Sequence, residues 1–120
     1  MKVLKLNRES EDFYVYMGPV FGSRLVDMDT RDRFYDDADK QWYVVPGKGA
    51  ASVREGSIRN FWAVSDEIAD AMIAAIIEDN PRRLEGVAPM QYEECFKNAG
   101  FHVEGYRKNF IRVYRYEKRH

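Results

Sequence analysis

Residues 91–101, QYEECFKNAGF, decide the fold class of this chain. The apolar and charged residues of this stretch are spaced as in a short amphipathic helix, and Gly100 suits the position just after such a helix ends. Phe101 then starts a strand, and residues 103–106 and 110–114 are rich enough in aromatic and β-branched residues to form a two-stranded ribbon. The last third of the chain is therefore predicted to run helix, strand, strand.

The rest of the chain alternates strand-like stretches with turn signals such as Pro46-Gly47 and Glu55-Gly56. The predicted strands are residues 3–6, 41–45, 50–54, 57–64 and 82–87. In the strand 57–64, alternation of period two predicts one face with Ile58, Asn60, Trp62 and Val64, and the other with Arg59, Phe61 and Ala63.

Four helices are predicted between and around these strands. The first starts at Ser10 and is interrupted by Gly18-Pro19, because Pro restricts the residue before it. The second, residues 21–30, places Phe21, Leu25 and Met28 on one face. The third opens at Ser65 and runs to residue 78, and the fourth spans residues 89–99. The predicted order is β-α-α-β-β-β-α-β-α-β-β.

Length and composition predict one globular domain, residues 1–120. Hydrophobic residues make up 45% of the chain, which excludes the disordered classes. The formal net charge of −1 gives no general attraction to nucleic acid or to anionic lipid. Cys95 is the one cysteine, the start of the chain has no signal-peptide pattern, and the apolar residues 68–77 are about half the length of a membrane span. A soluble, cytoplasmic protein without membrane contact is expected.

The order of elements and the helix ending resemble those of GCN5-related N-acetyltransferases (the GNAT superfamily). Members of that family have a Y-x-x-x-G-F helix end beside acetyl-coenzyme A, and residues 96–101 (FKNAGF) stand at that place here. The resemblance implies an α/β (α+β) fold with a mixed, mostly antiparallel sheet of six or seven strands flanked by helices. It also implies a coenzyme A site where the fourth strand meets the following helix.

That implied cofactor site is altered. In the family, a loop resembling V-x-P-x-x-R-x-x-G-x-G/A offers backbone N–H groups to the cofactor pyrophosphate. Here the helix begins directly at Ser65, and Glu67 and Ala69 stand where the loop glycines are expected. Asp66 and Glu67 would repel a pyrophosphate, and they also suit the first turn of a purely structural helix. No cofactor is therefore expected, and acetyl-coenzyme A only if the chain is a divergent acyltransferase.

The second chemical group of the family is a Tyr four residues before the G-F pair, which can protonate the departing thiolate. Phe96 occupies that position here and has no proton to give. Tyr92 lies one helical turn earlier on the same face, so it is the weak candidate for a catalytic acid. The other interpretation of Tyr92 is a residue of the core or its rim.

Five residues are candidates for lining a binding cleft. They are Arg24, Asn60, Trp62, Tyr92 and Phe96. Asn60 and Trp62 are chosen because they share a strand face. Arg24 follows a Gly-Pro break in the region that shapes the acceptor side of GNAT proteins, so its candidacy rests on the resemblance alone.

Cations and aromatic residues alternate in the C-terminal ribbon, which suits contact with phosphates and stacking on bases. The candidate nucleic-acid contacts are Arg107, Lys108, Arg112 and Arg115, interleaved with Tyr106, Phe110, Tyr114 and Tyr116. The alternative is an ordinary ribbon in which Ile111 and Val113 face the core and the charged residues face solvent.

Three functions remain open. The favoured one is a GNAT-like domain that binds a small molecule or a protein, or performs non-standard acceptor chemistry. The first alternative is a divergent acyl-coenzyme A-dependent N-acyltransferase, and the second a nucleic-acid-modifying or nucleic-acid-binding relative of the kind that some phages encode on this fold. No metal site is expected, because residues 35–39 lack the Gly and the distant Glu of an EF-hand loop and the chain has no zinc spacing.

Overall fold

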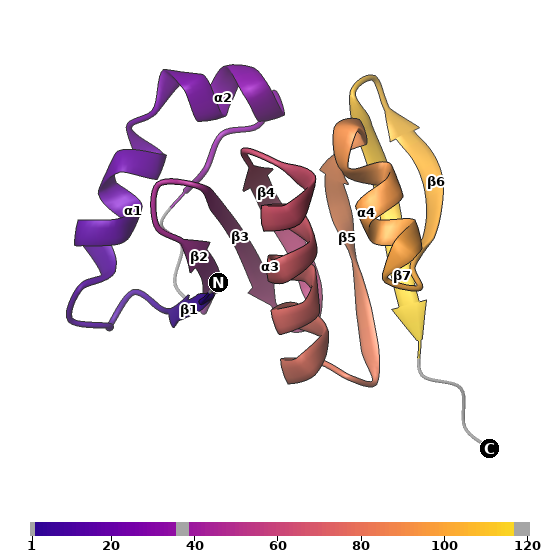
Figure 1. The fold of residues 1–120 in the computed structure, drawn as a ribbon, viewed down its shortest axis with the longest axis horizontal. Helices are drawn as coiled ribbons and strands as arrows, with labels where there is room; N and C mark the ends of the chain where they lie inside the picture. Colours follow the sequence, from indigo (N-terminus) through magenta and orange to yellow (C-terminus); the bar gives the residue numbers. More distant parts are fainter. Residues whose placement is uncertain (1, 36–38, 117–120) are drawn as a thin grey trace.

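The computed structural model describes residues 2–35 and 39–116, which form a seven-stranded sheet with helices on both faces (Figure 1). The strands are β1 (Leu4–Leu6), β2 (Gln41–Val45), β3 (Gly49–Arg54), β4 (Ser57–Ala63), β5 (Arg83–Pro89), β6 (His102–Arg107) and β7 (Phe110–Tyr116). The helices are α1 (Phe13–Phe21), α2 (Arg24–Thr30), α3 (Asp66–Asp79), the 3₁₀ turn η1 (Met90–Tyr92) and α4 (Glu93–Asn98). The order across the sheet is β1-β2-β3-β4-β5-β7-β6, and β4–β5 is its parallel pair. The predicted α+β class and order of elements are confirmed.

Two hydrophobic clusters show which helices cover which face of the sheet. In the first cluster, α3 and α4 pack on a face that includes Tyr43, Phe61 and Ile111. In the second, α1 and α2 pack on the opposite face around Trp42 and Trp62. Because α1 and α2 lie over the β1 end of the sheet (Figure 1), no described helix covers the second face of β5, β7 and β6. None of the described helices is long and apolar enough to cross a membrane.

The helix predicted to open at Ser65 is confirmed as α3, and its first turn shows why it begins there. The Ser65 hydroxyl accepts a hydrogen bond from the backbone N–H of Ile68 (3.3 Å) and so caps the helix. Asp66 and Glu67 lie in the first turn, where the helix dipole favours negative charge. The residues that face the sheet are buried: Ile68, Ala69, Met72, Ile73 and Ile76.

The predicted break at Gly18-Pro19 is wrong. Helix α1 runs from Phe13 through Pro19 to Phe21. Pro19 lies near the end of the helix, where the hydrogen bond that it removes would reach back to the carbonyl of Val15, an exposed residue. Burial of one apolar face on the sheet outweighs this loss, and its members are Phe13, Met17 and Val20.

The second helix begins later than predicted, at Arg24, because Gly22 and Ser23 separate it from α1. Ser23 is the N-cap, and its hydroxyl accepts a hydrogen bond from the backbone N–H of Val26 (3.2 Å). Val26 is buried, whereas Leu25 and Met28, predicted to share one face of this helix, are 68% and 72% exposed. Because Ser23 fixes where α2 begins, it also fixes that Val26, and not Leu25 or Met28, faces the sheet.

Strand β4 contains a bulge that the sequence pattern does not reveal. Ala50 of β3 pairs with Trp62, but Ser52 pairs with Arg59, so β4 carries one extra residue between these pairs. Asn60 has a φ of 52°, in the left-handed region that Asn tolerates better than most residues. The bulge therefore falls at Asn60.

The bulge reverses the alternation of side chains along β4. Ile58, Phe61 and Ala63 share the first cluster, whereas Trp62 belongs to the second. The predicted grouping of Ile58 with Asn60 and Trp62 is therefore wrong, because the extra residue shifts the faces by one.

The fourth predicted helix, residues 89–99, is much shorter in the structure. Strand β5 continues to Pro89, which pairs with Phe110 of β7, and η1 follows it. The α-helical part is only Glu93–Asn98. Pairing along β7 keeps the chain extended beyond the predicted strand end. Gly100 has a φ of 91°, as expected for a residue just after a helix.

Asp79 links the end of α3 to the first two strands. Lys5 donates a hydrogen bond from Nζ to Asp79 Oδ1 (2.8 Å), and the Tyr43 hydroxyl donates to Oδ2 (2.8 Å). The Lys5 hydrogen bond lowers the pKa of Asp79 and raises the pKa of Lys5. The charged pair is therefore the favoured state in the folded chain.

This pair predicts a pH dependence of stability. The pKa of Asp79 is lower in the folded chain than in the unfolded chain, so its charge stabilises the fold above the unfolded pKa of about 3.9. This stabilisation is lost as the pH falls through the folded pKa. The gap in urea midpoint between the native chain and Asp79→Asn should shrink from about pH 5 to about pH 2. Glu9→Gln, an exposed carboxylate on another segment, is the control. A gap that stays constant over this range would contradict a charge-based role for Asp79.

Candidate binding cleft and the gap between β4 and β5

Strands β4 and β5 are parallel but pair over a short stretch, Ser57 with Glu85 and Ile58 with Gly86. A glycine is required here, because a Cβ on Gly86 would lie 2.4 Å from the carbonyl oxygen of Ile58. Beyond this point the described parts of the two strands have no paired residues. The backbone groups of β4 that face this gap need other partners.

Tyr92 supplies partners for Ala63 in that gap. Its hydroxyl donates a hydrogen bond to the carbonyl oxygen of Ala63 (2.9 Å) and accepts one from its backbone N–H (2.8 Å). Its ring packs edge-on against Phe61, with centroids 4.9 Å apart. Tyr92 is 3% exposed, and burial raises the pKa of its hydroxyl, which keeps the group protonated. These contacts give Tyr92 a structural role; its role as an acid stays a prediction.

Phe96, the other candidate on this segment, lies in the core rather than at a surface. Its ring contacts Phe61 (centroids 5.2 Å apart) and meets Phe101 edge-on (5.1 Å). The neighbouring Cys95 is buried, and burial, followed by the charge of Asp70, raises the pKa of its thiol to about 12. The thiol is therefore protonated and unreactive near neutral pH.

The junction of β4 and α3 consists of Val64 and Ser65 alone. The Ser65 hydroxyl occupies the N–H of Ile68, and the carboxylates of Asp66 and Glu67 lie in the first turn of α3. A pyrophosphate at this helix end would meet two negative charges and would find one N–H already bonded. The expectation that the chain uses no coenzyme A stays a prediction.

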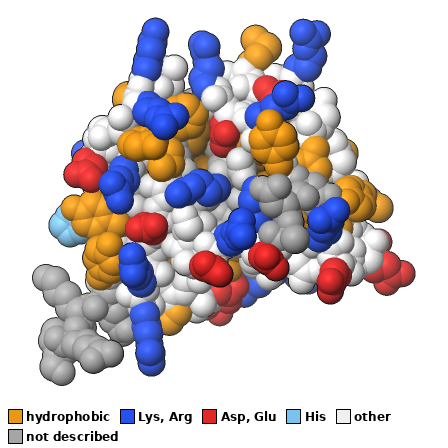
Figure 2. Space-filling view, turned by 180° about the vertical axis from the view of Figure 1, so that it is seen from behind, with side chains coloured by type: hydrophobic (Ala, Val, Ile, Leu, Met, Phe, Trp, Pro, Cys, Tyr) orange, Lys and Arg blue, Asp and Glu red, His pale blue; other side chains and the backbone are white. Residues whose placement is uncertain are grey.

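A cleft of about 610 Å³ opens on the face of the sheet opposite α3 and α4. It lies between the segment that follows α2 and the turn that joins β6 to β7, with β3 and β4 as its floor. Figure 2 shows this face, where Lys and Arg side chains are spread over the surface with hydrophobic groups between them and fewer acidic ones. Residues 36–38, part of the acidic turn considered as a metal loop, lie outside the described residues.

Asn60, 8% exposed, forms the floor of the cleft at the bulge of β4. Its side-chain oxygen accepts hydrogen bonds from Lys40 Nζ and Ser52 Oγ, both at 3.0 Å. Its amide nitrogen donates to Asp32 Oδ2 (3.2 Å) and to the carbonyl oxygen of Arg33 (3.4 Å). The bulge thus turns Asn60 into a bridge between the sheet and the segment after α2.

The cleft is rich in cations and aromatic rings. Among the described residues, its positive side chains are Arg33, Lys40, Arg54, Arg59 and Arg107, against two acids, Asp32 and Glu55. Its rings are Tyr35, Tyr106 and Phe110. The guanidinium of Arg107 lies 5.0 Å from the ring centroid of Tyr106, and that of Arg33 lies 5.9 Å from Tyr35. Such a surface attracts anions and offers flat faces for stacking.

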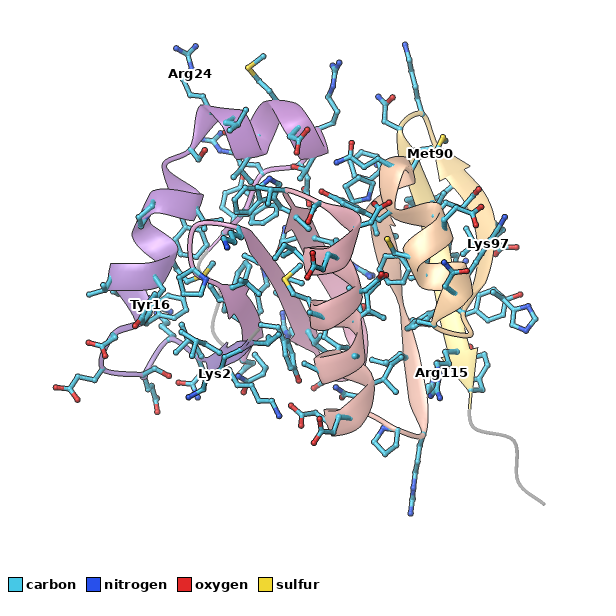
Figure 3. All side chains as sticks on the ribbon, viewed as in Figure 1. Lys2, Tyr16, Arg24, Met90, Lys97 and Arg115 are labelled. Atoms are coloured by element: carbon cyan, nitrogen blue, oxygen red, sulfur yellow. The ribbon has the colours of Figure 1, made fainter. Side chains whose placement is uncertain are left out.

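Of the five predicted cleft residues, only Asn60 lines this cleft. Trp62 is buried under α1 and α2, and Tyr92 and Phe96 are buried on the other face. Arg24 is exposed and points away from the sheet at the outer side of α2 (Figure 3).

Sequence reasoning did not find four of the five cleft cations, whereas Arg107 is among the predicted nucleic-acid contacts. Arg59, placed on the face opposite Asn60 by simple alternation, is exposed beside it because of the bulge. Arg33, Lys40 and Arg54 gave no motif, since they come from separate segments that meet only in the fold.

No protein-family model and no curated protein matches the sequence. Four chains of solved structures match. One is described as the crystal structure of TofI in an apo form; it is 16% identical, the match covers 95% of this chain and 89% of that chain, and the TM-score is 0.64. The fold is GNAT-like. At this level of identity the likeness concerns the fold alone.

Proposed function

We propose that this chain is a GNAT-like binding domain that does not use acetyl-coenzyme A and that takes an anionic ligand in the cleft around Asn60. The observation that carries the proposal is the Tyr92 hydroxyl, which bonds both backbone groups of Ala63 between β4 and β5. A ligand that entered this gap would displace a buried ring and would have to replace both hydrogen bonds.

The start of α3 also supports the part of the proposal that excludes acetyl-coenzyme A. Asp66 and Glu67 stand at the end of the helix that a pyrophosphate would approach. Two unit charges about 4 Å apart repel by roughly 1 kcal/mol in water and by several times more near a protein surface. The segment joining β4 to α3 is two residues long and contains no cation.

The composition of the cleft supports the other part of the proposal, that the cleft binds an anionic ligand. Five positive side chains against two carboxylates favour an anion, and three aromatic rings favour a ligand with a flat ring. The volume of about 610 Å³ lies within the range of small-molecule sites. A nucleoside monophosphate, which combines a phosphate with a flat base, is a suitable probe.

Calorimetric titration with acetyl-coenzyme A tests the first half. We expect no binding tighter than about 1 mM, which corresponds to about −4 kcal/mol. Micromolar affinity would overturn the proposal and favour the divergent acyltransferase, in which Tyr92 replaces the missing acid.

Titration with adenosine monophosphate tests the second half. Arg54→Gln and Arg107→Gln should each weaken its binding, because each removes a positive charge from the cleft. Arg24→Gln is the matched control, since this side chain is exposed on α2 away from the cleft. Equal loss in all three variants would place the ligand elsewhere.

A further inference from the structure

The second face of β5, β7 and β6 is covered by no described helix, and we call it the open face. Leu84, Ala88, Ile111 and Val113 of these strands are buried in the first cluster, so the residues between them point to the other side. The cross-strand register sets Glu85 and His102 beside Tyr114, and Val87 and Glu104 beside Arg112.

Three aromatic rings of the open face contact one another. The rings of His102 and Tyr114 stack with centroids 5.2 Å apart and planes inclined by 16°, and Tyr114 contacts Tyr116 at 5.8 Å. Tyr116 is 53% exposed, and the guanidinium of Arg83 lies 5.7 Å from its ring centroid. Phe110 stands at the other end of β7. A linear polymer along β7 would meet ring, cation, ring and ring in turn.

The charge of this surface is opposite to that of the whole chain. Among the described residues, and with the cleft included, seven positive side chains (the five of the cleft, Arg83 and Arg112) lie beside four carboxylates, Asp32, Glu55, Glu85 and Glu104, and Arg83 forms an ion pair with Glu85 (3.7 Å). The chain as a whole has a net charge of −1. Figure 2 shows Lys and Arg side chains over this face, with acidic side chains among them.

A smaller hollow of about 200 Å³ joins the cleft to the open face. Arg59, Val87 and Tyr106 line both the cleft and the hollow. Arg112 lines the hollow but not the cleft. Because the two hollows share these residues, a ligand longer than a mononucleotide could extend from the cleft toward Arg112 of β7.

We propose that the open face binds a single strand of nucleic acid, whose end lies in the cleft. The inference rests on the proposed function in this one respect, that the cleft takes the terminal phosphate and base. A sheet face with exposed rings suits unpaired bases, which stack on aromatic side chains, while cations beside the rings take the phosphates. An acidic peptide would meet the cations but would leave the rings without flat partners.

This surface differs from the one that the sequence predicted. Arg107 lines the cleft and Arg112 the hollow, as expected for ligand contacts, and Lys108 is exposed in the β6–β7 turn. Arg115 points to the other side, where its Nη1 donates to the carbonyl oxygen of Pro81 (3.3 Å). Ile111 and Val113 are buried, as the alternative of an ordinary ribbon expected, while the other side of β7 belongs to the open face.

Fluorescence anisotropy with labelled oligothymidylates of about 4, 8 and 12 nucleotides tests the proposal, starting at about 50 mM salt, where phosphate contacts are strong. Affinity should rise with length, and its logarithm should fall linearly with the logarithm of salt by about 0.7 per phosphate contact. Arg112→Gln should flatten this slope by about 0.7, whereas Arg115→Gln, on the same strand and the opposite face, should leave it unchanged. Tyr116→Ala should weaken binding about five- to 150-fold, the loss of one stacked base.

Three results would overturn the inference. They are no oligonucleotide binding at about 50 mM salt, equal affinity for polyglutamate, and equal loss from Arg112→Gln and Arg115→Gln. Binding of adenosine monophosphate with no gain from longer oligonucleotides would overturn the open face and leave the cleft proposal standing. Thermal unfolding of each variant shows whether a loss of binding reflects a loss of fold.

Discussion

Replacing Ile73 by Ala should lower the free energy of unfolding by about 2–5 kcal/mol, because the change removes buried methyl groups and leaves a cavity. Ile73 is 1% exposed and lies on the face of α3 that packs on the sheet. The central strands contribute the other side of this contact, so the cavity cannot collapse without moving the sheet. Urea unfolding followed by circular dichroism measures the loss.

Ile77→Ala is the matched control, since it is the same change on the same helix. Ile77 is only half-buried and packs at the margin of the first cluster. Its loss should be smaller than that of Ile73→Ala. A change below roughly half a kcal/mol for Ile73→Ala, typical of a surface position, would contradict the packing of α3.

The elements that sequence reasoning predicted correctly are those whose signals are local. Ser65 caps α3 through a neighbour three residues away, and Gly100 ends a helix through its own backbone conformation. Residues 41–45 form a strand, and the composition of this segment alone predicts one. Because such signals need no knowledge of distant contacts, the order of elements and the fold class could be read from the sequence.

The features that sequence reasoning missed depend on distant partners. Pro19 stays helical because α1 buries one face on the sheet, and β5 reaches Pro89 because β7 pairs with it. The bulge at Asn60 shifts the faces of β4 by one residue, which alternation cannot show. Since the cleft is built on that bulge, its cations could not be assembled from the sequence.

The candidate site illustrates the same limit. Asn60 was predicted from the strand face that it was expected to share with Trp62, but its partners Asp32 and Lys40 are 28 and 20 residues away in the chain. Tyr92 was found through a family pattern, and its partner Ala63 is 29 residues away. The family pattern points to Tyr92, but only the structure shows that its hydroxyl forms hydrogen bonds with the backbone of Ala63.

Tyr92→Phe should destabilise the chain strongly although it removes a single oxygen. The ring can stay in place against Phe61, but the N–H and the carbonyl of Ala63 both lose their partner. Each buried backbone group left without a hydrogen bond costs about 1–3 kcal/mol. With two such groups, the free energy of unfolding should fall by about 2–6 kcal/mol. Urea unfolding gives the total, and hydrogen exchange at the Ala63 amide reports the local opening.

Tyr106→Phe is the control, because its hydroxyl is on a side chain that is 48% exposed and the change should stay within about half a kcal/mol. The same pair of variants separates the two roles considered for Tyr92. A structural hydroxyl predicts loss of stability and faster exchange at Ala63 with no dependence on any ligand. A catalytic acid predicts unchanged stability and a loss of acyl transfer. Unchanged stability in Tyr92→Phe would therefore contradict the closed gap between β4 and β5, and with it the observation on which the proposed function rests.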